Sequence, residues 1–148
     1  MKFNVDEQVE VVKLSKENPD LSILGKIGTV KGYNLVNLVI VEINEENYAL
    51  EEDILDYVII GRKCFFDYVM EKYYEKDDSK GDFAKSLANM TYFPNIEEEE
   101  KIEILNNNRL LLYTLDNNTI LKSDEETYNT YLEIKRNYQD YFRTGREE

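Results

Sequence analysis

The chain has 148 residues, one cysteine, no histidine and a formal net charge of −13, from 31 acidic and 18 basic residues. Without histidine the commonest general base is missing, and the single Cys64 excludes an internal disulfide. A surface this acidic repels a phosphate backbone, which disfavours ordinary binding to duplex nucleic acid.

The sequence contains no signal that directs a chain into or across a membrane. No stretch approaches the roughly 18 consecutive apolar residues that a membrane-spanning helix needs. The start, MKFNVDEQVEV, lacks the apolar segment of a secretory signal peptide. A lone cysteine suits a reducing compartment. We therefore expect a cytoplasmic protein without a membrane partner.

The first 60 residues show the alternation and the turn signals of short β-strands. QVEVVKL alternates apolar and polar residues, and residues 35–43 (LVNLVIVEI) form the most apolar run. Further strands are predicted around 25–30, over 48–50 and over 55–60, with a turn at 44–47. Five short strands joined by tight turns predict a small, strongly bent barrel.

The segments VEVVKL, GKIGTVKGY, VIVEI and YALEEDILDYV resemble, in this order, the pattern of SH3-like and KOW-type small barrels. The resemblance covers about residues 5–60. It implies a strand entered through a glycine turn at GKIGTV, and a 3₁₀ turn before the closing strand within LEEDILDYV. Such barrels serve RNA, DNA, peptide and structural roles, so the resemblance implies no single function.

From Cys64 onward the apolar residues recur with a helical period. Phe65, Tyr68, Val69 and Tyr73 fall on one stripe of a first helix. Capping signals predict the starts of three more helices, at Ser79 with Asp82, at Asn95 with Glu98 and at Ser123 with Glu126. The first of these three helices is expected to reach Asn89, the second to direct Ile102 and Leu105 inward, and the third to cover 124–142. A short buried helix is also expected at 110–115.

The segments FFDYVMEKY, GDFAKSLANMTYFP, EKIEILNNNRLL and DEETYNTYLE resemble the YozE-like, SAM-like domain family of low-GC Gram-positive bacteria and their phages. Over about residues 64–135, the family's motifs match Asp78, Phe83-Ala84, Phe93-Pro94 and the pair Tyr128 and Tyr131. Tyr128 stands where the family tends to have Trp, and the third segment is longer and richer in Glu. The resemblance implies a compact helical bundle and no chemistry.

Together these patterns predict an α+β protein. Residues 1–60 are expected to form a five-stranded SH3-like barrel, and residues 64–148 a four- to five-helix SAM-like bundle. Three residues, Gly61, Arg62 and Lys63, would link the two domains.

No group of residues matches a catalytic, cofactor or metal motif. Cys64 has no histidine partner. It is interpreted either as a buried side chain beside Phe65 and Phe66 or as a thiol whose pKa is lowered by a helix N-terminus. Residues 77–82 fail as a calcium loop, because Gly81 occupies a position where an oxygen ligand is needed. We therefore expect no enzyme, no metal and no cofactor.

The residues left for a function are acids and tyrosines. The four consecutive acids Glu97 to Glu100 suit a solvated helix start, where the helix dipole stabilises negative charge, but they also offer charge to a partner. In the last helix one stripe holds Tyr131, Ile134, Tyr138 and Tyr141, and a second holds Tyr128, Leu132 and Phe142. A small bundle is not expected to bury both stripes of one helix, so internal packing and a partner surface both stay open. The partner-binding residues that we predict are Glu97, Glu98, Glu99, Glu100, Asp124, Glu125, Tyr131, Tyr138 and Tyr141.

The leading hypothesis is a non-catalytic protein that binds another protein through an acidic, tyrosine-rich surface. Its sharper form is a phage or mobile-element inhibitor of a basic, nucleic-acid-binding host factor, such as a CRISPR effector or a restriction enzyme. In that form spaced carboxylates would replace the phosphates of DNA.

The alternative hypothesis is direct nucleic-acid binding through the barrel. Stacking on an aromatic ring needs few charges, and the first domain offers a basic and aromatic set of residues. These residues are Lys13, Lys16, Lys26, Lys31 and Tyr33.

Overall fold

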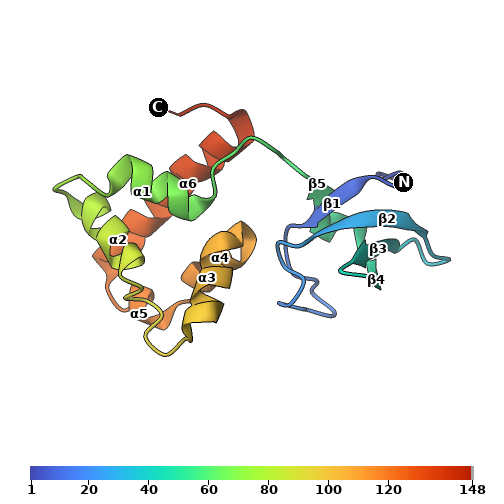
Figure 1. The fold of residues 1–148 in the computed structure, drawn as a ribbon, viewed down its shortest axis with the longest axis horizontal. Helices are drawn as coiled ribbons and strands as arrows, with labels where there is room; N and C mark the ends of the chain where they lie inside the picture. The colour runs from blue at the N-terminus through green and yellow to red at the C-terminus, as the bar shows by residue number, and fades with distance from the viewer. Residues whose placement is uncertain (148) are drawn as a thin grey trace. The chain divides into compact units, whose positions relative to one another are not determined.

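A computed structural model, in which residues 1–147 are described, shows an α+β chain that divides into two compact units. The first unit, Met1–Ile60, holds a five-stranded antiparallel sheet, and the second unit, Gly61–Glu148, is helical (Figure 1). Among the described residues, no helix is both long enough and apolar enough to cross a membrane.

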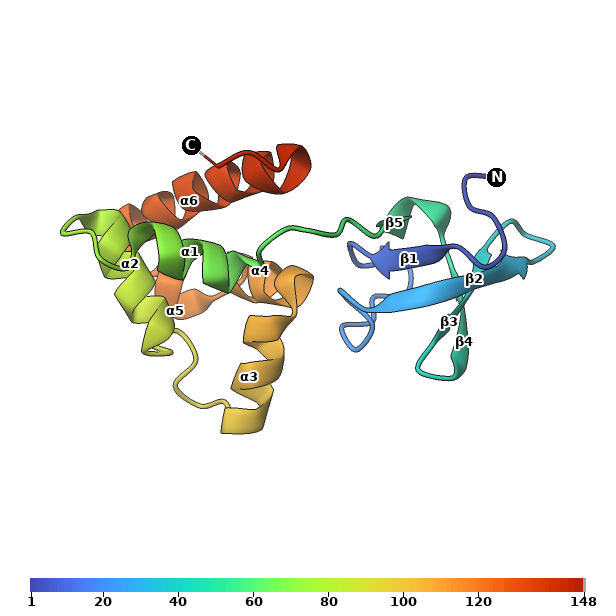
Figure 2. The same ribbon diagram turned by 45° about the horizontal axis from the view of Figure 1, so that its top comes forward.

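The sheet of the first unit is open, with strand order β4-β3-β2-β1-β5. Its edges are β4 and β5, and no pairing joins them, so the closed barrel that the sequence predicted is not confirmed. The predicted 3₁₀ turn is present as η1 (Glu52–Ile54), directly before β5. The strands are β1 (Gln8–Val11), β2 (Ile27–Tyr33), β3 (Val39–Ile43), β4 (Glu46–Leu50) and β5 (Leu55–Tyr57) (Figure 2).

Alternation along the strands builds the core of the first unit. Val9 and Val11 of β1 point to the same face and are buried, as are Val39, Val41 and Ile43 of β3. Glu10, Ile40 and Glu42 alternate with them and lie on the other, half-buried face, so the alternation in the sequence corresponds to the observed orientation.

The predicted strand over 35–43 begins only at Val39. Asn34 ends the preceding strand, because its side-chain oxygen accepts hydrogen bonds from the backbone N–H groups of Val36 (3.1 Å) and Leu38 (2.9 Å). Leu35 is 103% exposed and Val36 72% exposed. These two apolar residues therefore lie at a turn. The last predicted strand is also shorter than expected and ends at Tyr57.

The second unit contains six helices among the described residues, one more than the largest number predicted. Its core is rich in aromatic side chains, and the predicted stripe of Phe65, Tyr68, Val69 and Tyr73 is confirmed as buried. The helices are α1 (Phe65–Tyr73), α2 (Ser79–Ala88), α3 (Glu98–Asn106), α4 (Asn108–Asp116), α5 (Thr119–Lys122) and α6 (Glu125–Thr144).

Short side chains cap four of the six described helices, and at α2 and α6 the capping residue lies one position away from the residue that the capping signal had indicated. Asp78 rather than Ser79 accepts the backbone N–H of Gly81 and caps α2. Asp124 rather than Ser123 caps α6, through the N–H of Thr127. The extra helix α5 was missed; it is a single turn.

Helix α3 differs most from its prediction. It begins at Glu98, with Glu97 at the capping position and no side-chain cap, so Asn95 does not start it. Ile102, expected to point inward, is 52% exposed, whereas Ile104 is buried. Leu105, the other residue expected to point inward, is partly buried against the core.

Candidate protein-binding surface

The acidic residues predicted to bind a partner are all exposed. Glu97 to Glu100 cover the start of α3, Asp124 caps α6, and Glu125 is its first residue. Helix α3 packs on α4, whereas α6 packs on α2 and α5. Figure 2 shows α3 and α6 on opposite sides of the second unit, so the two acidic groups do not form one surface.

The three tyrosines predicted for the same surface are buried, and that part of the prediction is wrong. Tyr131 is 0% exposed, Tyr138 1% and Tyr141 6%. Their rings contact the aromatic core: Tyr131 and Tyr138 meet the ring of Phe65 edge-on, and Tyr141 stacks on Tyr68 at 5.2 Å. Side chains enclosed in this way are not available to a partner.

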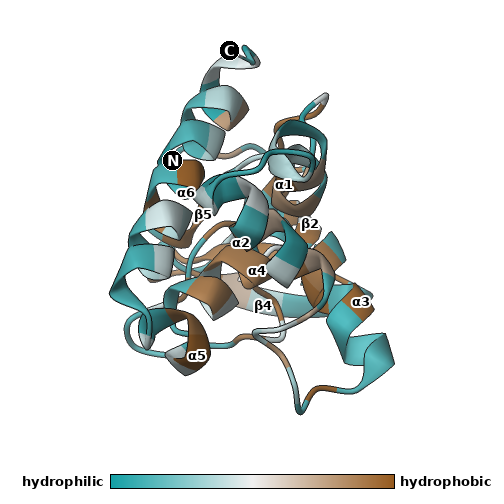
Figure 3. Cartoon of the chain, turned by 90° about the vertical axis from the view of Figure 1, so that its left-hand side faces the viewer, coloured by the Kyte–Doolittle hydropathy of each residue, from teal (hydrophilic) through white to brown (hydrophobic). Residues whose placement is uncertain are grey.

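The second apolar stripe of α6 behaves as the sequence argument expected. Leu132 is 40% exposed, and Tyr128 and Phe142 are half-buried. The bundle thus covers one stripe of α6 fully and the other only in part. Figure 3 shows mostly hydrophilic residues along the visible face of α6 and over the start of α3.

The hydroxyl of Tyr131 belongs to an internal polar network. It donates to Oδ1 of Asp116 at 2.7 Å, and Nζ of Lys135 lies 2.7 Å from Oδ2 of the same carboxylate. Burial, and secondly the Asp116 carboxylate, raise the pKa of Tyr131, so this phenol stays protonated. The network has a structural role: it satisfies a carboxylate at the end of α4.

A hollow of about 350 Å³ lies between α2, α5 and the start of α6. Three carboxylates line it, from Asp82, Asp124 and Glu126, and we call it the acidic hollow. Two aromatic residues, Phe83 and Tyr92, lie against it, with ring centroids 5.9 Å apart. The remaining lining residues are Ser79, Ser86, Ile120, Leu121, Thr127 and Thr130.

Within the described part of the chain, none of the three carboxylates forms an ion pair. Asp124 accepts the N–H of Thr127 at 3.3 Å as a helix cap, which leaves its second oxygen available. Residues 1–147 also contain no group of acids placed to hold a metal ion. The acidic hollow therefore offers separate carboxylate acceptors around a concave site, an arrangement that suits the cationic end of a lysine or arginine side chain.

Sequence reasoning found Asp124 of this hollow but not Asp82 or Glu126 as site residues. Both had been interpreted only as parts of capping motifs, at the starts of α2 and α6. The available signal was that α2 and α6 both carry acids in their first turns. The sequence does not show that these two helices are neighbours.

Cys64 does not have the surroundings of a catalytic thiol. It is half-buried at the N-cap of α1, and burial raises its pKa, with the Asp67 carboxylate adding to the shift. Its thiol therefore stays protonated at neutral pH, as the packing interpretation of this residue expects.

Three of the five residues of the basic and aromatic set lie beside acids. Lys13 lies 3.9 Å from Asp53, and Lys31 lies 3.9 Å from Glu42. The hydroxyl of Tyr33 donates to Glu52 at 2.6 Å and accepts the N–H of Phe3. The first unit carries 12 acidic and 5 basic residues, and this net negative charge disfavours binding to a phosphate backbone.

Comparison of the chain with protein-family models, with curated proteins and with solved structures finds no match.

Proposed function

We propose that this chain is a non-catalytic protein that binds a basic segment of another protein in the acidic hollow. The observation that carries the proposal is the presence of three carboxylates without ion pairs, from Asp82, Asp124 and Glu126, around a preformed concave site. Acids scattered over a convex surface would serve solubility alone. Around a hollow, they can surround one cationic side chain.

Electrostatics favours such a partner at longer range as well. The net charge of −13 attracts a basic protein and accelerates their encounter, and the hollow supplies the short-range contacts. The alternative explanation of the acids is helix stabilisation, because Asp82, Asp124 and Glu126 all lie at or near helix N-termini. The two explanations make different predictions for variants that keep the Asp124 cap.

The test is titration of the full chain with a deca-arginine peptide, followed by calorimetry at two salt concentrations. Replacing Asp82 by Asn and Glu126 by Gln should weaken binding by about tenfold, since each lost charge-assisted hydrogen bond is worth roughly 1.5–3 kcal/mol at most and exposure reduces that value. The matched control replaces Glu99 and Glu100 by Gln and removes the same charge from α3. Equal weakening in both variants would show general attraction without a site and would contradict the proposal.

A sharper form of the proposal makes the partner a nucleic-acid-binding host factor, with the chain acting as a phage or mobile-element inhibitor. The two separate acidic groups, at α3 and at the acidic hollow, support this form because a protein that normally holds DNA presents several cations. The test is a gel shift in which the chain competes with duplex DNA for a purified CRISPR effector or restriction enzyme. Failure to displace DNA from such proteins, together with retained binding to deca-arginine, would overturn the sharper form alone.

We also propose that the first unit has an SH3-like fold and that the second unit is a YozE-like, SAM-like domain. The strand order and the 3₁₀ turn before β5 support an SH3-like first unit. Buried Phe83, Ala84, Leu87 and Phe93 support a YozE-like, SAM-like second unit. A crystal structure in which β1 did not lie between β2 and β5 would contradict the first assignment.

A further inference from the structure

Strand β4 forms an unprotected edge of the sheet in the first unit. It pairs with β3 only, and within residues 1–147 none of its residues makes a backbone hydrogen bond elsewhere. An edge strand of this kind presents free N–H and C=O groups to any extended chain that approaches.

The hairpin register shows which groups are free. Asn44 and Glu45 form a two-residue turn with positive φ at both positions, so Ile43 and Glu46 are the hydrogen-bonded pair that closes it. Pairs alternate along an antiparallel ladder, so Glu46, Tyr48 and Leu50 bond to β3. It follows that Asn47 and Ala49 direct their backbone N–H and C=O groups away from the sheet.

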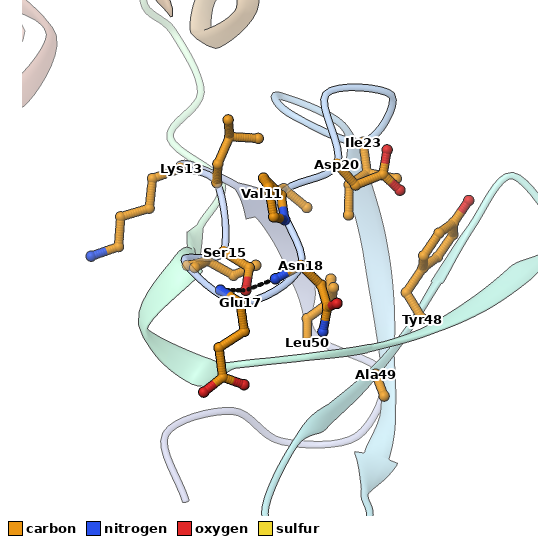
Figure 4. Close-up of a pocket in the computed structure, with 13 residues that line it drawn as sticks. Val11, Lys13, Ser15, Glu17, Asn18, Asp20, Ile23, Tyr48, Ala49 and Leu50 are labelled. Atoms are coloured by element: carbon orange, nitrogen blue, oxygen red, sulfur yellow. Dashed lines mark hydrogen bonds between the residues drawn. The ribbon is translucent and has the colours of Figure 1, made fainter.

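A second hollow, of about 480 Å³, lies along this edge. It is lined by three successive residues of β4, namely Tyr48, Ala49 and Leu50. Successive side chains of a strand point to opposite faces, so a hollow that meets all three must run beside the backbone. Figure 4 shows Tyr48 and Ala49 on opposite sides of the strand, with the loop between β1 and β2 across from them.

Hydrogen bonds of Ser15 fix the conformation of that loop. The hydroxyl of Ser15, which is 7% exposed, donates to Glu51 at 2.6 Å and accepts the N–H groups of Glu17 and Asn18 (Figure 4). This hydrogen bond also lowers the pKa of Glu51, which keeps its carboxylate charged as an acceptor. The hollow is therefore preformed, and a ligand need not order the loop.

The charges around this hollow select a cation. Glu17 and Asp20 line it and form no ion pair in the described residues, whereas the lining Lys13 already lies beside Asp53. Its floor is apolar and includes Val11, Ile23, Leu50 and Ile54.

We propose that an extended segment of a partner protein, with alternating basic and apolar residues, adds to the sheet as a strand along β4. Its backbone bonds to Asn47 and Ala49, and its basic side chains, which share one face of the added strand, enter the hollow. Their aliphatic parts lie over the apolar floor and their charged ends meet Glu17 and Asp20. This site lies in the first unit and does not rest on the proposed function of the acidic hollow. A second copy of the chain is a poorer occupant of the edge, because it would bring Glu45 and Glu46 of both copies and two charges of −13 together.

The experiment uses the full chain and a short synthetic peptide of alternating valine and arginine, with a valine and glutamate peptide for comparison. Amide hydrogen exchange should show new protection at Asn47 and Ala49 only with the arginine peptide. Ala49→Pro removes the outward N–H without removing a bond to β3, and should weaken binding by about tenfold. Ala49→Val keeps the N–H group and should bind as the unchanged chain does.

Several outcomes would overturn the proposal. These are unchanged binding by Ala49→Pro, protection confined to the second unit, equal binding of the glutamate peptide, or protection of Asn47 and Ala49 in a dimer without peptide. If Ala49→Pro fails to fold, the doubly neutral variant Glu17→Gln and Asp20→Asn decides the matter, because its peptide affinity should fall while the exchange pattern of the free chain stays the same.

Discussion

The hydroxyl of Tyr138 donates a hydrogen bond to the backbone carbonyl of Lys63, 75 positions earlier, at 2.8 Å. The same hydroxyl accepts from Nδ2 of Asn108 at 2.8 Å, while Oδ1 of Asn108 accepts the N–H of Phe65. A second hydroxyl, of Tyr141, accepts the N–H of Lys63 at 2.7 Å. Tyrosine rather than phenylalanine is needed on α6 because these hydroxyls satisfy backbone groups where the chain enters the second unit.

Replacing Tyr138 by Phe should therefore destabilise the protein although the ring remains. The carbonyl of Lys63 and the amide of Asn108 would lose their shared partner, at a cost of about 1–3 kcal/mol. Urea unfolding would measure the loss. Tyr113→Phe is the matched control, because the Tyr113 side chain is 37% exposed and the change should cost less than about 0.5 kcal/mol. Equal stability of the two variants would refute the structural role of the Tyr138 hydroxyl.

The sequence predicted the helical stripe of α6 but could not predict what its tyrosines do. Periodicity shows that Tyr131, Tyr138 and Tyr141 share a face. Whether that face is core or partner surface depends on the neighbours brought to it by α1, α2 and α4, and these come from distant parts of the chain. The acids were easier to place, because charged side chains without a buried partner stay exposed.

The error at residues 35–38 has a local cause. Apolar content favoured a strand there, whereas the Asn34 side chain competes with the ladder by bonding the backbone two and four residues further on. The acidic hollow was missed for another reason: it requires α2 and α6 to be neighbours, and no local pattern encodes that contact.

Exposure of the turn gives a simple prediction. Leu35→Ala should change the free energy of unfolding by less than about 0.5 kcal/mol, since the side chain is fully exposed. Val39→Ala, four positions later, should cost about 1–3 kcal/mol because it opens a cavity in the core of the first unit. Thermal unfolding of both variants would test the boundary of β3. A large loss for Leu35→Ala would restore the longer strand that the sequence predicted.

Gly28 in β2 allows close approach of two strands. A Cβ at this position would lie 2.6 Å from both the carbonyl oxygen of Glu42 and Cγ1 of Val41. The backbone of β3 cannot yield as a flexible side chain would, so Gly28→Ala should destabilise the protein by about 1–3 kcal/mol. Gly61→Ala is the control, because it meets no atom within 4 Å and carries only the strain of a positive φ, about 1–2 kcal/mol. Amide hydrogen exchange at β2 and β3 should rise for Gly28→Ala alone, and unchanged exchange there would contradict the steric explanation.

Alkaline pH should weaken the second unit through its buried tyrosines. Burial raises the pKa of Tyr131 and of Tyr138, with the Asp116 carboxylate adding to the shift at Tyr131. A raised pKa means that the folded state keeps protons that the unfolded state releases above pH about 10. The stabilisation is thus complete below that pH. At higher pH it falls by about 1.4 kcal/mol per pH unit for each tyrosine that is ionised only on unfolding.

Urea unfolding at neutral pH and at pH about 11 would measure this dependence, with tyrosinate absorbance reporting ionisation. Lys63 changes stability in the same direction, because the carboxylates of Glu147 and Glu71 raise its pKa, so the comparison needs a variant that isolates the phenol. Tyr131→Phe should be less stable at neutral pH and should lose less on going to alkaline pH than the unchanged chain does. If the two proteins lost stability in parallel, the burial of Tyr131 would not be the source of the dependence.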